Sequence, residues 1–123
     1  MAFKIDEKGN ITMIQGDSGI IKVNGLDTNQ NYLVYLAIQD KDRNPVGQEL
    51  CINSNNLSTV VFELTGDYTD LLKVPKNKPY EIYYYGIKVC VREDNFEDTL
   101  ILGEGSIGSI NSIVVYPKKV EGI

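Results

Sequence analysis

Short apolar runs recur along this 123-residue chain, and Gly, Asn, Asp and Pro bound them about every eight to twelve residues. This spacing is typical of a β-sandwich or a barrel, and no helical stripe of about ten or more residues interrupts it. The eight tyrosines and eleven glycines also favour strands and turns. We therefore predict about eight strands, over residues 11–15, 19–23, 31–39, 48–52, 59–64, 80–92, 99–105 and 109–117.

The alternation of side chains predicts which residues face the core, because every second residue of a strand lies on the same face. The strand over 31–39 is apolar on both faces, which predicts a central position in its sheet. In the strand over 59–64, the core residues are Val60, Phe62 and Leu64. In the strand over 80–92, one face carries Tyr83, Tyr85, Ile87, Val89 and Val91, and the other carries Lys88, Cys90 and Arg92. Gly86 in this strand indicates a bulge or a close backbone approach.

A long connection between Leu64 and Tyr80 is rich in turn formers and has room for one helical turn. Antiparallel hairpins with one such crossing predict an all-β fold, an immunoglobulin-like antiparallel β-sandwich of about seven or eight strands. We expect residues 1–123 to form a single domain, with flexible ends at 1–9 and 118–123. In such sandwiches a tyrosine at this corner often donates a hydrogen bond to the preceding backbone, and we expect Tyr80 to do so.

The charge and the termini exclude several classes of function. A net charge of −5 and a pI near 4.6 disfavour binding to nucleic acid or to an anionic membrane, because both select basic surfaces. The sequence has no apolar run of the length of a membrane span and no signal peptide, so we expect synthesis in the cytoplasm. In that reducing compartment Cys51 and Cys90 are expected to be free thiols.

The tetrapeptide Gly16-Asp17-Ser18-Gly19 resembles the surroundings of the nucleophilic serine in chymotrypsin-like proteases. A serine needs a neighbouring base, most often histidine, and this chain contains no histidine. We therefore interpret the stretch as a turn between two strands. Its glycines would allow the reversal, while the side chains of Asp17 and Ser18 would cap exposed amides.

Two acidic stretches are candidates for a calcium site. Asp40, Asp42 and Asn44 have the spacing that begins a helix-loop-helix calcium loop, but Pro45 and Cys51 stand where that loop needs Gly and Glu. A hairpin turn explains them better. The second stretch is a weak calcium candidate, and a solvated hairpin tip explains it better; it contains Glu93, Asp94, Glu97 and Asp98. Two cysteines without histidine are too few ligands for zinc.

The tyrosines of "PYEIYYYG" are the strongest candidates for a binding role, because amphipathic rings serve well at interfaces. We take Tyr83, Tyr84 and Tyr85 as candidate interaction residues, although alternation places about half of the tyrosines in the core. The sequence contains no set of residues for a nucleophile, a general acid or a metal centre. It therefore predicts a binding or structural module with no cofactor, and not an enzyme.

Several segments together resemble a known family: "ITMIQGDSG", "YLAIQDKDRNPVG", "VVFEL", "DYTDLL", "KPYEIYYYGIKV", "DTLILGEG" and "SIVVYP". Over roughly residues 10–118 they are similar to the N-terminal domain of the baseplate upper protein of tailed phages and to related phage tail modules. The resemblance implies an immunoglobulin-like domain that docks onto other phage tail proteins in a multi-copy assembly. It also implies a virion protein, assembled in the host cytoplasm, that forms a homo-oligomer.

Two other functions are compatible with the residues. An acidic phage-encoded inhibitor could occupy a basic cleft in a host defence factor, because the chain is negatively charged. A carbohydrate-binding module could use outward tyrosines as a stacking platform. Both remain alternatives to the virion structural protein at this point.

Overall fold

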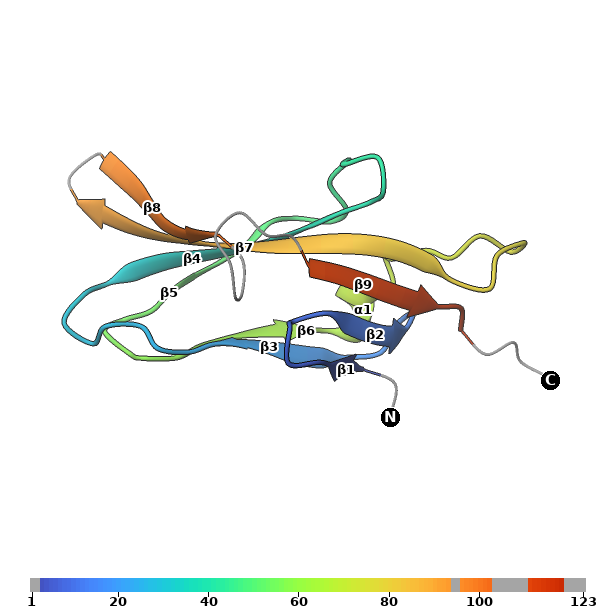
Figure 1. The fold of residues 1–123 in the computed structure, drawn as a ribbon, viewed down its shortest axis with the longest axis horizontal. Coiled ribbons are helices and arrows are strands. Elements are labelled where there is room, and N and C mark those ends of the chain that lie inside the picture. The colour runs from blue at the N-terminus through green and yellow to red at the C-terminus, as the bar shows by residue number, and fades with distance from the viewer. Residues whose placement is uncertain (1–2, 94–95, 103–110, 119–123) are drawn as a thin grey trace.

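The structure is a computed structural model that describes residues 3–93, 96–102 and 111–118, with side chains over 3–91 and 111–118. The regular secondary structure of the described residues is almost entirely strand, as predicted (Figure 1). Its elements are β1 (Lys4–Ile5), β2 (Ile11–Ile14), β3 (Gly19–Val23), β4 (Tyr32–Gln39), β5 (Leu50–Asn53), β6 (Val60–Leu64), α1 (Gly66–Thr69), β7 (Glu81–Glu93), β8 (Phe96–Leu102) and β9 (Asn111–Tyr116).

Two layers of strands form an all-β sandwich, which confirms the predicted fold class. One sheet has the order β1-β2-β9-β7-β4-β5, with β8 also paired to β7, and the other contains β3 and β6. Figure 1 shows β3 and β6 in one layer and β4 and β7 in the other. In an immunoglobulin-like domain strands B and E share one sheet, and strands C, F and G share the other. Here β3 and β6 take the places of B and E, while β4, β7 and β9 take the places of C, F and G.

One strand pair departs from the antiparallel sandwich that the sequence predicts. β2 and β9 are parallel, with Ile11 opposite Ile113 and Ile14 opposite Tyr116, whereas the other pairs in the described residues are antiparallel. Parallel neighbours need a long connection rather than a hairpin, and here most of the chain lies between them. The sequence could not predict this pair, because it joins the first and last predicted strands and local patterns do not show which distant strands pair.

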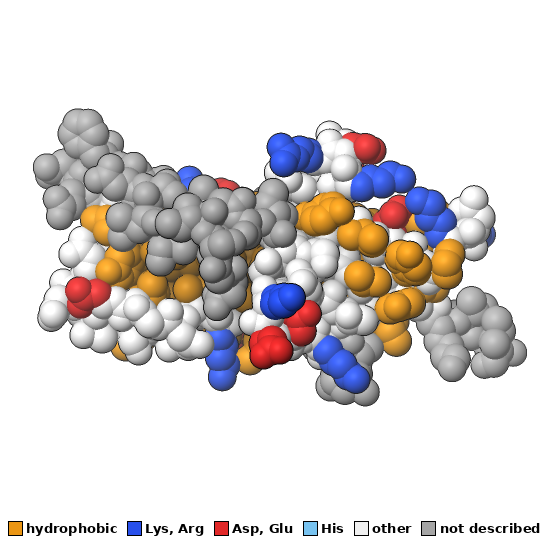
Figure 2. All heavy atoms as spheres, viewed as in Figure 1, with side chains coloured by type: hydrophobic (Ala, Val, Ile, Leu, Met, Phe, Trp, Pro, Cys, Tyr) orange, Lys and Arg blue, Asp and Glu red, His pale blue; other side chains and the backbone are white. Residues whose placement is uncertain are grey.

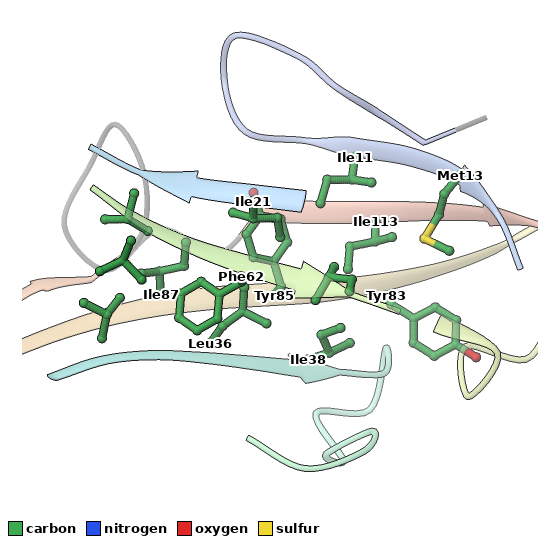
Figure 3. Packing of buried hydrophobic residues seen from close by; sticks show 14 of the residues in the cluster. Ile11, Met13, Ile21, Leu36, Ile38, Phe62, Tyr83, Tyr85, Ile87 and Ile113 are labelled. Atoms are coloured by element: carbon green, nitrogen blue, oxygen red, sulfur yellow. The ribbon is translucent and has the colours of Figure 1, made fainter. Parts of the chain in front are cut away.

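The core lies between the two layers and follows the alternation of the strands. Val60, Phe62 and Leu64 of β6 are buried, while Val61 and Glu63 between them are exposed, as predicted. Figure 3 shows Phe62 and Ile21 directed toward the side chains of the larger sheet. Full burial of one such apolar side chain stabilises the fold by about 1.5–3 kcal/mol. The sheet members of the cluster include Ile11, Met13, Leu36, Ile38, Tyr83, Tyr85, Ile87, Val89, Ile113 and Val115.

The crossing from β6 to β7 contains the single helical turn that the sequence allows, although the turn starts at Gly66. The Thr65 hydroxyl caps it by accepting a hydrogen bond from the Tyr68 amide at 3.3 Å. The corner bond of the crossing is made by Tyr83, whose hydroxyl donates to the Lys73 carbonyl. The expectation for Tyr80 is therefore wrong: its side chain is 43% exposed, because it precedes β7 and lies on the outer side of the sheet.

The N-terminal segment, which was expected from the sequence to be part of a flexible end over 1–9, forms a short strand and a turn in residues 3–9. Lys4 and Ile5 pair with β2, and Phe3 packs against the core. Gly9 lies at the end of the following turn with φ of 89°, and its carbonyl accepts a hydrogen bond from the buried Tyr85 hydroxyl. Residues 1–2 and 119–123 lie outside the described residues.

β7 has no bulge at Gly86, and the register shift beside this strand lies in its pairing with β8. Gly86 pairs regularly with Ala37 of β4, whereas the register with β8 shifts between Val89 and Cys90. Cys90 and Lys88 lie on one face of β7, as the alternation predicts, because they pair with Leu33 and Tyr35 of β4. Cys90 is nevertheless buried, whereas Lys88 is partly exposed. Cys51 is exposed, and neither cysteine forms a disulfide, as predicted.

Candidate interaction surface

The Gly16-Asp17-Ser18-Gly19 stretch is a turn packed on the crossing helix. The Asp17 amide donates to the Ile14 carbonyl at 3.0 Å, and Gly16 between them has φ of 87°, where glycine costs least. The buried Thr69 hydroxyl donates to the Asp17 carbonyl at 2.8 Å. The turn is thus confirmed. The side chains of Asp17 and Ser18 make no hydrogen bond with the described residues, so the backbone and not these side chains holds it.

A polar cluster around Asp70 fixes the same turn to the end of the chain. The Gln15 amide nitrogen donates to the Asp70 carbonyl at 2.9 Å, and Lys118 Nζ lies 2.6 Å from Asp70 Oδ1. The hydrogen bond from Lys118 holds the pKa of the Asp70 carboxyl below its usual value, and the nearby Lys73 acts in the same direction. Because Lys118 and Asp70 are partly exposed, this cluster is a modest structural contact and not an acid–base pair in a cleft.

The structure describes the side chains of only one of the two acidic stretches that are candidates for a calcium site. Asp40 Oδ1 accepts hydrogen bonds from the amides of Asp42 and Asn44, each at 2.9 Å, so this carboxylate closes its own hairpin as predicted. The side chains of the second stretch, with Glu93, Asp94, Glu97 and Asp98, lie outside the described residues. Over the side chains that the structure does describe, no group of three or more His, Cys, Asp or Glu is placed to hold a metal ion.

In the same part of the chain, no helix is long and apolar enough to cross a membrane.

The three consecutive tyrosines of β7 lie on opposite faces of the sheet. Tyr83 and Tyr85 are 7% and 3% exposed, which corrects their assignment to an interaction surface. Burial is also the main cause of a raised pKa for the Tyr83 hydroxyl. Tyr84 points to the other face and is half-buried. Of the three predicted interaction residues, only Tyr84 is therefore on the surface.

Tyr84 belongs to an apolar patch on the outer face of the larger sheet, which we call the outer patch. Ile82 is opposite Val114, and Ile14 is opposite Tyr116, so these side chains share one face. Figure 2 shows hydrophobic side chains gathered near the end of β9, with Lys and Arg side chains along one border. The outer patch consists of Ile14, Tyr80, Ile82, Tyr84, Val114 and Tyr116.

Three members of the outer patch are well exposed: Ile14, Tyr80 and Tyr116 at 36%, 43% and 43%. The rings of Tyr80 and Tyr116 are tilted against each other with centroids 6.0 Å apart, which is a favourable geometry for an aromatic pair. Sequence reasoning missed Ile14 and Tyr116, although the two-residue period of their own strands contained the signal. What the period could not supply was the parallel pairing that joins them.

A pocket of about 410 Å³ adjoins the outer patch. It lies between the hairpin that follows β4 and the loop that precedes β7, and its lining combines apolar rings with two lysines. Lys78 Nζ lies 3.5 Å from Glu81 Oε2, whereas Lys41 forms no ion pair with the described residues. The lining residues are Lys41, Lys78, Pro79, Tyr80, Glu81, Ile82 and Tyr84.

Comparison of the chain with protein-family models, with curated proteins and with solved structures found no match.

Proposed function

We propose that this chain is a non-enzymatic structural protein of a tailed-phage virion, a docking module that binds other tail or baseplate proteins through the outer patch. The exposed apolar patch on the larger sheet is the observation that carries the proposal. Contiguous exposed apolar surface commonly marks a site of protein association, and tyrosine is enriched at such sites. The segments that resemble phage tail modules supply the class of partner.

The composition of the outer patch supports a protein partner. Tyr80 and Tyr116 give large, rigid contact areas that lose little conformational entropy on binding. The net charge of −5 disfavours nucleic acid and anionic membranes as partners. In this proposal the chain is present in several copies per particle, is synthesised in the host cytoplasm and has its place in the virion.

Mass spectrometry of purified particles, from the phage whose genome encodes the chain, tests the proposal. We expect the wild-type chain to be a stoichiometric component, and we expect the double variant Tyr80→Ser/Tyr116→Ser to be at least tenfold depleted. The matched control is Ile20→Ser/Val61→Ser, because these two residues are exposed apolar side chains on the other sheet. Absence of the wild-type chain from particles, or equal incorporation of both double variants, would overturn the proposal.

A further inference from the structure

β7 extends beyond the end of its neighbour β4. The last pair between the two strands is Gln39 with Tyr84, and the hairpin turn then begins at Asp40, whose carbonyl accepts from the Arg43 amide at 3.0 Å. The first three residues of β7, 81–83, therefore pair with β9 on one side and have no described strand on the other.

The backbone groups of Ile82 point toward this vacant side. The Ile38 carbonyl accepts from the Val46 amide on the β5 side of β4, so the next residue, Gln39, directs its backbone groups toward β7. The backbone N–H and C=O groups of its partner Tyr84 point back toward β4. Because this direction repeats every two residues along a strand, the backbone groups of Ile82 point the same way. The Ile82 amide donates to the side chain of its own neighbour, Glu81 Oε1, at 3.3 Å, a local bond that an added strand would replace.

The pocket beside the outer patch lies at this vacant position, because Ile82, Tyr84 and Lys41 line it together. Its walls are suited to side chains of a bound segment. Tyr80 and Pro79 are exposed and apolar, while Lys41 is exposed and Lys78 is 39% exposed despite its contact with Glu81. The lining also contains Glu81, which pairs with Lys78, so in a chain whose net charge is −5 the pocket carries two cations and one carboxylate beside the Ile82 backbone.

We propose that an extended segment of a partner protein, rich in carboxylate side chains, adds as a short strand beside residues 81–83. Its backbone bonds to the amide and carbonyl of Ile82, its carboxylates pair with Lys41 and Lys78, and its apolar side chains pack on Tyr80. Strand addition uses backbone bonds for affinity and side-chain pockets for selectivity, and complementary charge fixes the partner. The inference rests on the proposed docking function and names the chemistry of the segment that docks.

Selection from a random twelve-residue peptide library, displayed on filamentous phage, tests this inference on the intact chain. We expect the enriched peptides to alternate Glu or Asp with β-branched or aromatic residues. The synthetic consensus peptide should bind the double variant Lys41→Glu/Lys78→Glu at least tenfold more weakly than the wild type. The matched control is Lys4→Glu/Lys22→Glu, which makes the same change of charge at two exposed lysines outside the pocket. We expect this control to lose less than threefold, and circular dichroism should show both variants folded.

The amide of Ile82 supplies the second measurement. In ¹⁵N-edited NMR spectra the consensus peptide should shift this amide, and N-methylation of the peptide backbone should abolish the effect. The inference fails if no peptide is enriched, if the consensus lacks acidic residues, if both lysine variants bind equally, or if the shifts lie elsewhere. Shifts that depend on protein concentration without peptide would instead indicate a second copy and would also overturn it. The docking function itself fails separately, by normal incorporation of Tyr80→Ser/Tyr116→Ser into particles.

Discussion

The inner and outer tyrosines of the larger sheet differ in what their hydroxyl groups do. Tyr83 and Tyr85 bury their rings and donate to the carbonyls of Lys73 and Gly9, which ties the crossing and the N-terminal turn to β7. Tyr80 and Tyr116 lie against each other on the open face. A buried hydroxyl requires a partner, whereas an exposed one can bond to water or to another protein. The same residue type thus holds the fold on one face and is available for binding on the other.

The largest expected difference is between two neighbouring residues of β7. Tyr85→Ala should lower the free energy of unfolding by about 3–5 kcal/mol, because it removes a buried ring and leaves a cavity. Tyr84→Ala should lower it by about 1 kcal/mol or less, because that ring is half-exposed. Urea denaturation followed by circular dichroism measures both values. Equal losses would contradict the division of the two faces.

A slightly smaller effect is expected at Gly9, where the inner network meets the N-terminal turn. An added Cβ would lie 2.2 Å from Asn111 Nδ2, and the φ of 89° is unfavourable for alanine. Gly9→Ala should therefore cost about 2–3 kcal/mol, from backbone strain and from the disturbed Asn111 side chain. Gly25→Ala is the control, because Gly25 has φ of 80° but open space around it. If the two variants melt at the same temperature, close packing at Gly9 is not important.

The hydroxyl at the crossing gives a sharper comparison of the two faces. Tyr83→Phe should cost about 1 kcal/mol, because the Lys73 carbonyl loses its donor while the buried ring remains. Tyr80→Phe should leave stability unchanged within about 0.5 kcal/mol. Thermal unfolding of the two variants side by side measures the difference, and a larger loss at Tyr80 would restore it as the corner residue.

Gly86 tests whether the outer face is open in the middle of β7. A Cβ added at this residue would have no atom within 4 Å, and the φ of Gly86 is not in the left-handed region. Gly86→Ala should raise the free energy of unfolding by about 0.5–1 kcal/mol, because the unfolded chain loses freedom without any new clash. Destabilisation in urea denaturation would show that another group occupies this face.

The smallest expected effect concerns the pH dependence of the Asp70 cluster. The native pKa of Asp70 lies below its usual value, so its contribution to stability is present above the unfolded pKa and is lost as the pH falls through the native one. NMR titration of the carboxyl carbon should show Lys118→Met raising the pKa toward its ordinary value. Lys8→Met, at an exposed lysine of the N-terminal turn, is the control and should leave that pKa unchanged. An Asp70 pKa that does not respond to Lys118→Met would contradict the ion pair.

The sequence predicted the features that depend on local period and missed those that depend on distant pairing. Alternation placed Phe62 in the core correctly, and it put Tyr83 and Tyr85 on one face of their strand without showing that this face is the buried one. The corner bond moved from Tyr80 to Tyr83 because it depends on where the Lys73 carbonyl lies after the crossing. The register shift between β7 and β8 lies beside Cys90, and the period of a single strand does not reveal it.

The candidate surface divided in the same way. Tyr84 was within reach of sequence reasoning, because it alternates with two core tyrosines. Tyr116 and Ile14 join it only through the parallel pairing of β2 with β9, between the two ends of the chain. The vacant side of Ile82 depends on the residue at which β4 ends relative to β7, and single-sequence patterns do not give that register.

The most direct test of the outer patch is a competition during infection. Wild-type protein and Tyr80→Ser/Tyr116→Ser are produced in equal amounts, and mass spectrometry measures their ratio in purified particles. The expected result is at least a tenfold excess of wild-type protein, with a loss of unfolding free energy of about 1–2 kcal/mol in the variant, because both rings are partly exposed and their mutual contact is lost. An equal ratio in particles, with both proteins folded, would contradict a binding role for the outer face.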